Sequence, residues 1–204
     1  METVILANGK FPEHPLPLSY LKSAERIVCC DGAVESLVRF RLEPFAIIGD
    51  CDSLGPEIIE KYGDRIFVEE EQETNDLTKS VKWCVHEGYT DLVIIGATGK
   101  REDHTLGNIS LLAEYSVIAG VKMITDTGIF LPFQKSARIK SLPGQQISIF
   151  SINPETEISS VGLMYPLKRR KLRNWWEATL NEALGESFSL EFAGGPLIIY
   201  LAFM

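Results

Sequence analysis

The sequence predicts an α/β fold: an N-terminal, mainly parallel three-layer α/β domain followed by a small all-β sandwich domain. Two observations support this division. In residues 1–134, short apolar runs alternate with segments of helical periodicity, a pattern typical of a parallel sheet with helices on both faces. In residues 135–204, short β-type runs follow one another between turns rich in Pro, Gly, Asn and Glu. We therefore expect two domains, 1–134 and 135–204.

The strands of the first domain are expected where apolar runs end in glycine or a polar residue. The clearest run, FAIIGD at 45–50, follows Pro44 and ends in Gly49 and Asp50. Similar runs occupy residues 3–9, 26–33, 65–70, 91–99, 121–125 and 128–133. Ligands of such sheets bind beyond the carboxyl ends of the strands, so the polar residues at these ends are the first candidates for a site.

Helices are predicted between these runs. Residues 55–63 have proline near the start and glycine at the end. Residues 74–88 carry an apolar stripe at helical spacing, and Gly88 ends it. A further helix is expected to open at Asp103, and a short one covers Ala33–Phe40.

The second domain is expected to be built almost entirely from strands. One segment, 174–184, could make a helical turn or two. A domain of roughly 70 residues lies near the lower limit for a self-sufficient core, so we expect it to pack against the first domain or another copy of itself. The β-type runs occupy residues 136–142, 145–152, 158–167, 187–193 and 196–203.

The charge balance limits the possible partners. The 204 residues carry a formal net charge of −8, with 45% hydrophobic and 24% charged residues. An acidic chain of this kind is a poor partner for nucleic acid, whose phosphates need a basic surface. The one basic run, KRRKLR at 168–173, is short enough to be a solvated turn between strands.

The compartment is indicated by the N-terminus and the cysteines. No apolar run reaches the length of a membrane span, and METVILANGK lacks the basic start and cleavage site of a signal peptide. The four cysteines, Cys29, Cys30, Cys51 and Cys84, form no CxxC pair, and the three histidines have no zinc spacing. Free thiols are typical of a reducing compartment, so we expect a cytoplasmic protein that contacts no membrane.

Two aspartates follow the strand at 45–50. In an extended chain alternate residues point the same way, so Asp50 and Asp52 could face one Mg²⁺ ion while Cys51 points back into the core. Mg²⁺ binds through one or two carboxylates plus substrate phosphates. The alternative is that Asp50 caps a turn and Asp52 caps the next helix, and the pair by itself does not decide between these interpretations.

A third carboxylate stands beside a lysine in the segment TNDLTKS. Asp76 is placed in the first turn of a helix, with Lys79 one turn later on the same face. The functional interpretation makes Asp76 a further metal group and Lys79 a phosphate contact. In the structural alternative, Asp76 complements the helix dipole and Lys79 pairs with it.

The segment GATGKREDHTLGN at 96–108 has the character of a phosphate-binding loop. Gly96 and Gly99 would let the backbone approach a ligand closely, and Lys100 and Arg101 supply positive charge. The segment matches neither a Walker A loop nor the GxGxxG fingerprint.

The end of this segment opens the next helix. Asp103 is expected at its start, as an N-cap or as part of the site. His104 and Asn108 lie four residues apart on one face of the helix, and for His104 alone a polar surface position is the preferred interpretation. Together with the carboxylates, these groups suit Mg²⁺-dependent transfer from a nucleotide, in which catalysis is mostly positioning and charge neutralisation.

Taken together, five segments of the sequence resemble motifs of the thiamine pyrophosphokinase family. The resemblance spans both predicted domains, and the motifs occur in the family's order and at its usual separations. The matching segments are CDGA (30–33), IIGDCDSL (47–54), TNDLTKSV (74–81), GATGKREDHTLGNISLL (96–112) and GLMYPL (162–167).

The resemblance implies the reaction of ATP with thiamine to give AMP and thiamine diphosphate. The thiamine hydroxyl attacks the β-phosphorus, so a whole diphosphoryl group is transferred. Carried onto this chain, Asp50, Asp52 and Asp76 would hold Mg²⁺, while Lys79 and Arg101 steady the phosphates. Asp103 would complete the catalytic group, and the residues expected to bind nucleotide or thiamine are Asp31, Gly32, Gly96, Gly99, Asn108, Thr179 and Asn181.

The resemblance also implies a catalytic α/β domain over 1–134, a thiamine-binding β-sandwich over 135–204, and a homodimer. In that family the β-domain of one chain completes the thiamine site of the other. The sequence departs from the family pattern at Leu180, where the family usually has a serine that helps to hold thiamine, although Thr179 is close by. Milder departures are Asn8 in the usual GG pair and Ala33 after Asp31-Gly32.

Two other functions remain open on the sequence. The Leu180 departure leaves room for a related Mg²⁺-dependent pyrophosphokinase that acts on another alcohol, such as a pterin. A non-catalytic thiamine- or nucleotide-binding protein would need the metal carboxylates to be absent, and Asp50, Asp52 and Asp76 are all present.

Overall fold

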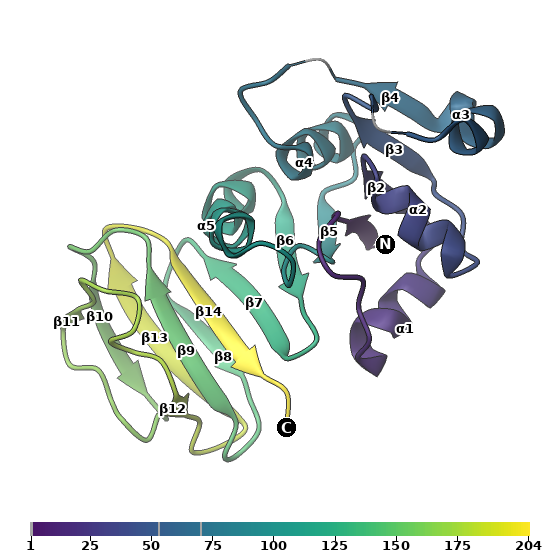
Figure 1. Cartoon of the computed structure of the whole chain (residues 1–204). Helices are drawn as coiled ribbons and strands as arrows, with labels where there is room; N and C mark the ends of the chain where they lie inside the picture. The colour runs from purple at the N-terminus through teal and green to yellow at the C-terminus, as the bar shows by residue number, and fades with distance from the viewer. Residues whose placement is uncertain (1, 53, 70) are drawn as a thin grey trace. The chain divides into compact units, whose positions relative to one another are not determined.

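The computed structural model describes residues 2–52, 54–69 and 71–204 and divides into two compact units. The first unit runs to Leu111 and includes Ile118–Asp126, and the second comprises Leu112–Val117 and Thr127–Met204. The chain passes from the mainly α/β part to the all-β part in sequence order (Figure 1). The division of function at residue 134 stays a prediction.

The first unit is built on a parallel sheet in the order β6-β5-β1-β2-β3-β4. Each neighbouring pair of these strands is parallel. All four residues of β1, β2 and β3 are buried, as expected for strands covered on both faces. The strands are β1 (Thr3–Leu6), β2 (Ile27–Cys30), β3 (Ala46–Gly49), β4 (Ile66–Val68), β5 (Asp91–Ile95) and β6 (Gly120–Ile124).

Helices lie on both faces of this sheet. Helix α2 packs on β2, and α4 packs on β1, β2 and β3 from the opposite side (Figure 1). The prediction of a three-layer, mainly parallel α/β domain is confirmed. The helices are α1 (Pro15–Ser23), α2 (Ala33–Arg39), α3 (Pro56–Tyr62), α4 (Asp76–His86) and α5 (Glu102–Ile118), with a 3₁₀ turn, η1, at Gly63–Arg65.

Two differences from the expected elements have simple causes. No helix is predicted from the sequence over Pro15–Ser23, where the structure has α1. Both of its prolines stand in the first turn, where no intrahelical N–H is needed, and His14 caps the helix by accepting from Leu16 N at 3.2 Å. The run expected at 65–70 contains β4, and its last residue lies outside the described part of the chain.

The second unit is an antiparallel β-sandwich, as predicted. One layer has the order β12-β9-β14-β7 and the other β11-β10-β13-β8. Its strands are β7 (Gly128–Phe133), β8 (Ala137–Lys140), β9 (Gln146–Ser151), β10 (Glu157–Val161), β11 (Arg170–Lys171), β12 (Asn181–Glu182), β13 (Ser187–Ala193) and β14 (Leu197–Ala202).

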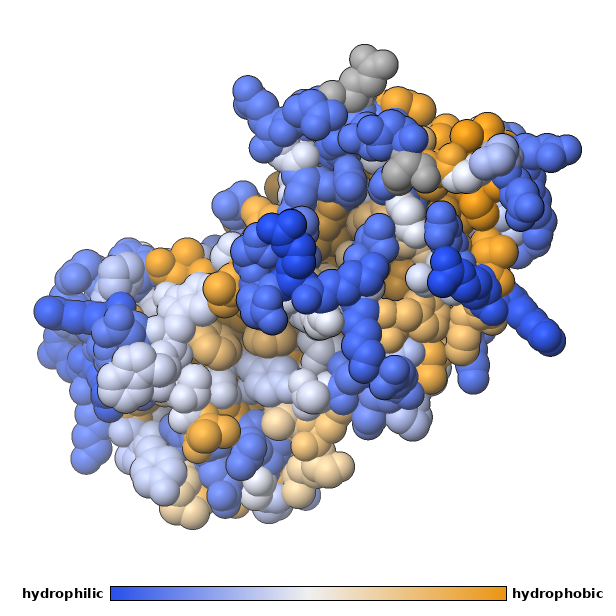
Figure 2. Space-filling model, viewed as in Figure 1, coloured by the Kyte–Doolittle hydropathy of each residue, from blue (hydrophilic) through white to orange (hydrophobic). Residues whose placement is uncertain are grey.

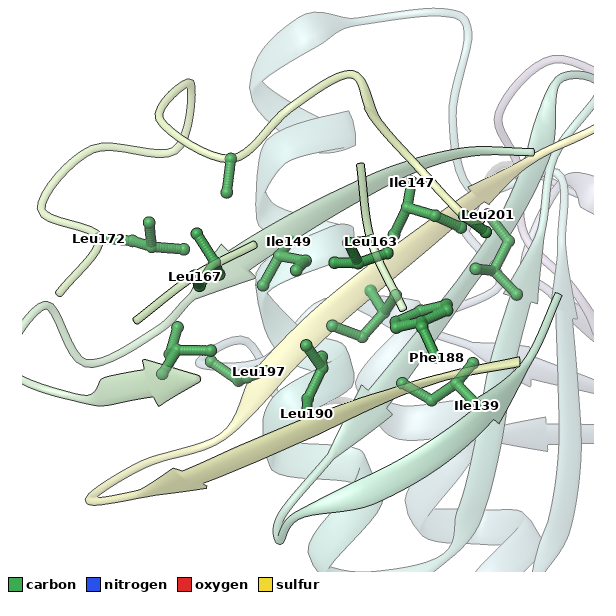
Figure 3. Close-up of a cluster of buried hydrophobic side chains, with 14 residues drawn as sticks. Ile139, Ile147, Ile149, Leu163, Leu167, Leu172, Phe188, Leu190, Leu197 and Leu201 are labelled. Carbon is green, nitrogen blue, oxygen red and sulfur yellow. The ribbon is translucent and has the colours of Figure 1, made fainter. Parts of the chain in front are cut away.

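The sandwich core is apolar throughout. Figure 3 shows Phe188 and Leu190 of one layer facing Ile147, Ile149 and Leu197 of the other. Buried and more exposed residues alternate at the start of β13, as expected of a strand with one buried face, whereas β9 and β14 each have three consecutive buried residues. Burial of these side chains supplies the main favourable free energy of this small unit.

The segment 174–184 forms isolated turns and the short strand β12 instead of a helical turn or two. Leu180 adopts φ +56, a left-handed backbone that ends any helical run, and Asn181 then pairs with β9 at Ile147.

The basic run at 168–173 lies on an exposed strand edge. Three of its cations pair with glutamates of the same unit: Arg169 with Glu157, Arg170 with Glu177 and Lys171 with Glu155. Hydrophilic residues gather over β10 and β11 (Figure 2). Among the described helices, none has both the length and the hydropathy required to cross a membrane.

Candidate functional site

A cleft of about 440 Å³ lies in the first unit, where the strands of the sheet end. Its walls come from the chain just after β1, β2, β3 and β5 and from the first turns of α4 and α5, which is the position expected for a ligand in such a sheet. The lining residues are Ala7, Asn8, Gly9, Cys30, Asp50, Gln72, Thr74, Asn75, Asp76, Leu77, Lys79, Ala97, Thr98, Lys100, Arg101, His104, Thr105 and Asn108.

The floor of the cleft is made by two backbone segments that touch. Gly9 N donates to Gly96 O at 2.6 Å, and Lys10 N donates to Thr98 O at 2.8 Å. A Cβ atom at Gly9 would lie 2.3 Å from Gly96 O, so no other residue fits without moving the chain. Gly96 and Gly99 have φ +70 and +84. These two predicted residues shape the loop, while their neighbours supply the lining.

Of the three carboxylates predicted to hold a metal, Asp50 and Asp76 line the cleft and Asp52 does not. Cys51 has φ +57, so the chain is not extended between Asp50 and Asp52, and simple alternation does not align them. Asp50 lines the cleft, whereas Asp52 is exposed and is absent from its lining. Cys51 is partly exposed, so the expectation that it points into the core is wrong.

Four aspartates contribute negative charge at Cys51. Burial raises the pKa of the Cys51 thiol to about 11, and the negative charges of Asp31, Asp50, Asp76 and Asp52 add to this shift. Asp31 approaches because Gly49 has no side chain: a Cβ there would lie 2.9 Å from Asp31 Cβ. Gly32 begins the next helix as the N-cap of α2.

The pKa of Asp76 is affected by these neighbouring charges. Burial raises its pKa, the charge of Lys79 lowers it, and the charges of Asp31 and Asp50 raise it again. A cation placed among these carboxylates would relieve the repulsion. The donor set therefore fits Mg²⁺, a hard ion that prefers oxygen ligands.

The protein does not supply a complete metal cage. Within residues 2–52, 54–69 and 71–204, no three His, Cys, Asp or Glu side chains are placed so that they could hold a metal ion by themselves. This is consistent with magnesium sites of the kind that use one or two carboxylates, waters and substrate phosphates.

Lys79 is the buried cation of the cleft. Its side chain is only 5% exposed, and its Nζ lies 3.5 Å from Asp76 Oδ1. Burial of an ammonium group is costly without a counter-ion, so Lys79 both needs Asp76 and can attract a phosphate. The two residues predicted to lie on one face of a helix are thus brought together.

Arg101 and Asp103 form an exposed forked pair. Arg101 Nε donates to Asp103 Oδ1 at 3.0 Å, and Nη2 donates to Oδ2 at 2.5 Å. This contact lowers the pKa of Asp103 to about 2, helped by the backbone N–H of His104. Asp103 is not in the cleft lining, whereas its partner Arg101 is.

Asparagines join the remaining walls. Asn108 Nδ2 donates to Ala97 O at 2.8 Å, and Asn75 Nδ2 donates to Asn108 Oδ1 at 3.2 Å. Lys100 Nζ donates to Asn8 Oδ1 at 3.1 Å. Asn75 was not among the predicted site residues, although its place before an acidic helical turn is a recognisable N-cap signal.

Other lining residues were also missed by sequence reasoning. His104 is exposed, as preferred for it, and also lines the cleft; its spacing from Asn108 was the available signal for the second property. Gln72, Thr98 and Thr105 had no signal beyond their closeness to predicted residues.

Thr179 and Asn181 lie in the second unit, in a separate cavity of about 470 Å³. Asn181 is buried and clamps a loop: Nδ2 donates to Tyr165 O at 2.8 Å, and Oδ1 accepts from Tyr165 N at 3.1 Å. Thr179 Oγ1 donates to Trp176 O at 2.9 Å. Leu180, between them, is 68% exposed. The cavity is lined by Tyr165, Pro166, Leu167, Arg170, Glu177, Ala178, Thr179, Leu180 and Asn181.

Comparisons with known proteins agree with this architecture. The family model described as "Thiamin pyrophosphokinase, catalytic domain" matches residues 18–124, and "Thiamin pyrophosphokinase, substrate-binding domain" matches 128–200. Thiamine pyrophosphokinase 1 of Oryza sativa is 30% identical over 194 residues, covering 80% of this chain and 73% of that protein. Thiamin pyrophosphokinase 1 of Caenorhabditis elegans is 26% identical, covering 71% of this chain and 65% of its own length.

Solved structures support the fold. Thiamine pyrophosphokinase from Bacillus subtilis superimposes with a TM-score of 0.81 at 22% identity, covering 99% of each chain. Thiamin pyrophosphokinase from Candida albicans superimposes with a TM-score of 0.79 at 19% identity, covering all of this chain and 90% of its own. On the matches to both domain models and the sequence relatives, the chain belongs to the thiamin pyrophosphokinase family.

Proposed function

We infer that this chain transfers the diphosphoryl group of ATP to the hydroxyl of thiamine, giving thiamine diphosphate and AMP, as its family does. One structural observation supports this inference for particular residues. Asp50, Asp76 and the buried Lys79 line a single cleft whose floor is two tightly packed glycine segments. Negative groups for a metal and a positive group for phosphate stand side by side there.

Each residue has a proposed role. Asp50 and Asp76 would hold Mg²⁺ from the cleft, and the ion would supply positive charge against the phosphates. Asp52, proposed from the sequence as a third ligand, lies outside the cleft lining and would add only to the negative charge of this region. Lys79 and Arg101 bind phosphate oxygens, and Asp103 holds the Arg101 fork at the rim. Asp31, Gly32, Gly96 and Gly99 set the shape and polarity of the nucleotide side of the cleft. Asn108 fixes the loop after β5 through Ala97 O.

In this proposal the chain binds ATP in an open polar cleft, and the protein forms no covalent bond to the substrate. The negative charge that develops in phosphoryl transfer is met by cations already held in place, which is the main source of rate enhancement in such enzymes. Lys79 meets this need well, because its burial restricts the side chain and excludes water from it.

Thiamine recognition is proposed for the second unit. Thr179 keeps lone pairs free to accept a hydrogen bond while donating to Trp176 O. Asn181 acts by holding the Tyr165 loop. We propose a homodimer in the cytoplasm, in which the sandwich of one chain completes the thiamine site of its partner.

A second candidate function keeps the mechanism and changes the acceptor. Leu180 stands exposed where the family usually has a serine, so the pocket offers one hydroxyl fewer for a pyrimidine ring. An alcohol such as a pterin is the alternative acceptor. A non-catalytic binding protein is disfavoured, because the carboxylates and Lys79 meet in one cleft.

The test is an assay of the purified chain with ATP, Mg²⁺ and a panel of alcohols. We expect thiamine diphosphate and AMP in equal amounts, with AMP release dependent on both thiamine and Mg²⁺. Release of AMP with a pterin alcohol and not with thiamine would transfer the assignment to the second candidate. Tight thiamine binding without turnover would instead support the binding protein.

A further inference from the structure

We propose that Asn75 is a positioning residue for the transfer reaction, acting through Asn108 to hold α4 in register with the loop that follows β5. The inference rests on the proposed function, since it assigns Asn75 a role in setting the geometry of that same cleft. Asn75 lines the cleft, and its amide bonds to Thr78 and Asn108.

Asn75 is the N-cap residue of α4. Asn75 Oδ1 accepts from Thr78 N at 2.9 Å and from Thr78 Oγ1 at 2.8 Å, so the oxygen of its amide is fully used at the helix start. Asp76 directly follows this cap as the first residue of the helix, and Lys79 lies one turn further on. The orientation of the Asn75 side chain is therefore fixed relative to both functional groups.

The nitrogen of the Asn75 amide makes a separate contact. Asn75 Nδ2 points away from α4 and donates to Asn108 Oδ1 on α5 at 3.2 Å. Asn108 Nδ2 in turn donates to Ala97 O at 2.8 Å, in the loop between β5 and α5. Two amides thus form a continuous chain of hydrogen bonds from the α4 cap to the loop.

These hydrogen bonds connect two walls of the cleft, one from α4 and one from the loop after β5. On one side are Asp76 and Lys79, and on the other are Thr98 and Arg101, which also line the cleft. A metal and a phosphate that bridge the two walls require a fixed width between them. A displacement of about 1 Å in such a site can cost about 100-fold in rate.

A simple capping role is the competing explanation, and the chemistry of the amide distinguishes the two. Serine is as good an N-cap as asparagine, because its hydroxyl also accepts from the N–H groups of the first turn. Serine is too short to reach Asn108. Asn75→Ser therefore keeps the cap of α4 and removes only the link to α5.

The experiment compares the full-length wild type with Asn75→Ser, Asn108→Ala and the double variant. Steady-state kinetics with ATP, Mg²⁺ and thiamine are combined with thermal unfolding and with calorimetry of a non-hydrolysable ATP analogue plus Mg²⁺. For Asn75→Ser we expect about a tenfold lower kcat, an unchanged KM for thiamine and a melting temperature within about 2 °C of wild type.

The double variant gives the decisive comparison. If the two amides act as one link, Asn75→Ser has no further effect once Asn108 is alanine, so the double variant has the kcat of Asn108→Ala. A wild-type kcat in Asn75→Ser, losses that multiply in the double variant, or a loss equal to the fraction of unfolded protein would each overturn the proposal.

Failure of the proposed function has a separate signature. If the wild type makes no thiamine diphosphate, the assignment of the reaction fails, whereas calorimetry still reports on the link without turnover. In that arm we expect Asn75→Ser to weaken binding of the ATP analogue by a few-fold and to do so only when Asn108 is present. Equal affinities in all four proteins would overturn the link.

Discussion

The cleft of the first unit and the cavity of the second differ in how their polar groups are used. In the cleft, Asp50, Asp76 and Lys79 crowd together with more charge than they neutralise among themselves. In the cavity, Asn181 is bound to the Tyr165 backbone and Arg170 pairs with Glu177. The comparison teaches that the first site is assembled for charge, and the second for shape, with most of its polar groups serving the fold.

The largest expected effect tests the charge of the first site. Asp76→Asn removes one carboxylate from the group that shares the proposed metal and should lower kcat/KM by about 1,000-fold or more, because charge neutralisation carries most of the catalysis. Product formation by chromatography measures the loss. Asp64→Asn, on the exposed turn η1 outside the cleft, is the matched control and should keep its activity. Activity of Asp76→Asn close to wild type would end the comparison.

The next prediction compares one cation from each region. Lys79→Met removes the buried ammonium and should reduce kcat by about 100-fold, with weaker ATP binding. Arg170→Met removes a cation whose partner is Glu177 and should change turnover by less than about threefold. Kinetics at varied ATP measure both. Similar losses in the two variants would show that charge does not distinguish the regions.

A third prediction concerns the core that supports the shape of the second site. Phe188 is 1% exposed among the apolar side chains of the sandwich (Figure 3), so Phe188→Ala should destabilise the second unit by about 3–5 kcal/mol. Urea unfolding followed by fluorescence measures the change. Ile139→Val in the same core should cost only about 0.5–1.5 kcal/mol. Equal midpoints for the two variants would contradict a tightly packed core.

The smallest effect concerns the glycine floor of the cleft. Gly9→Ala places a Cβ atom against Gly96 O and should shift the loop, raising the KM for ATP by about tenfold and costing about 1–3 kcal/mol of stability. Gly63→Ala is the control, because a Cβ there meets nothing within 4 Å. Kinetics and thermal unfolding measure both. An unchanged KM for ATP in Gly9→Ala would show that the floor of the cleft does not affect nucleotide binding.

Much of the fold was predictable because the relevant forces are local. Buried strands such as Ala46–Gly49 are short apolar runs, and glycines and prolines mark their ends. Helix α1 was not predicted; its Pro15 and Pro17, unfavourable in most helical positions, are acceptable because they stand in the first turn. The grouping of Asp50, Asp76 and Lys79 followed from the rule that strand ends in a parallel sheet converge.

The sequence by itself determined the fold class, the family and the place where acidic and basic groups meet. Only the tertiary structure decided how they meet. The left-handed backbone of Cys51 sends Asp50 and Asp52 to different surroundings, and a fork ties Arg101 to Asp103. The link from Asn75 to Asn108 joins residues 33 positions apart in the chain. Backbone dihedrals at single residues and contacts between distant segments depend on the whole packed chain, so no local pattern specifies them.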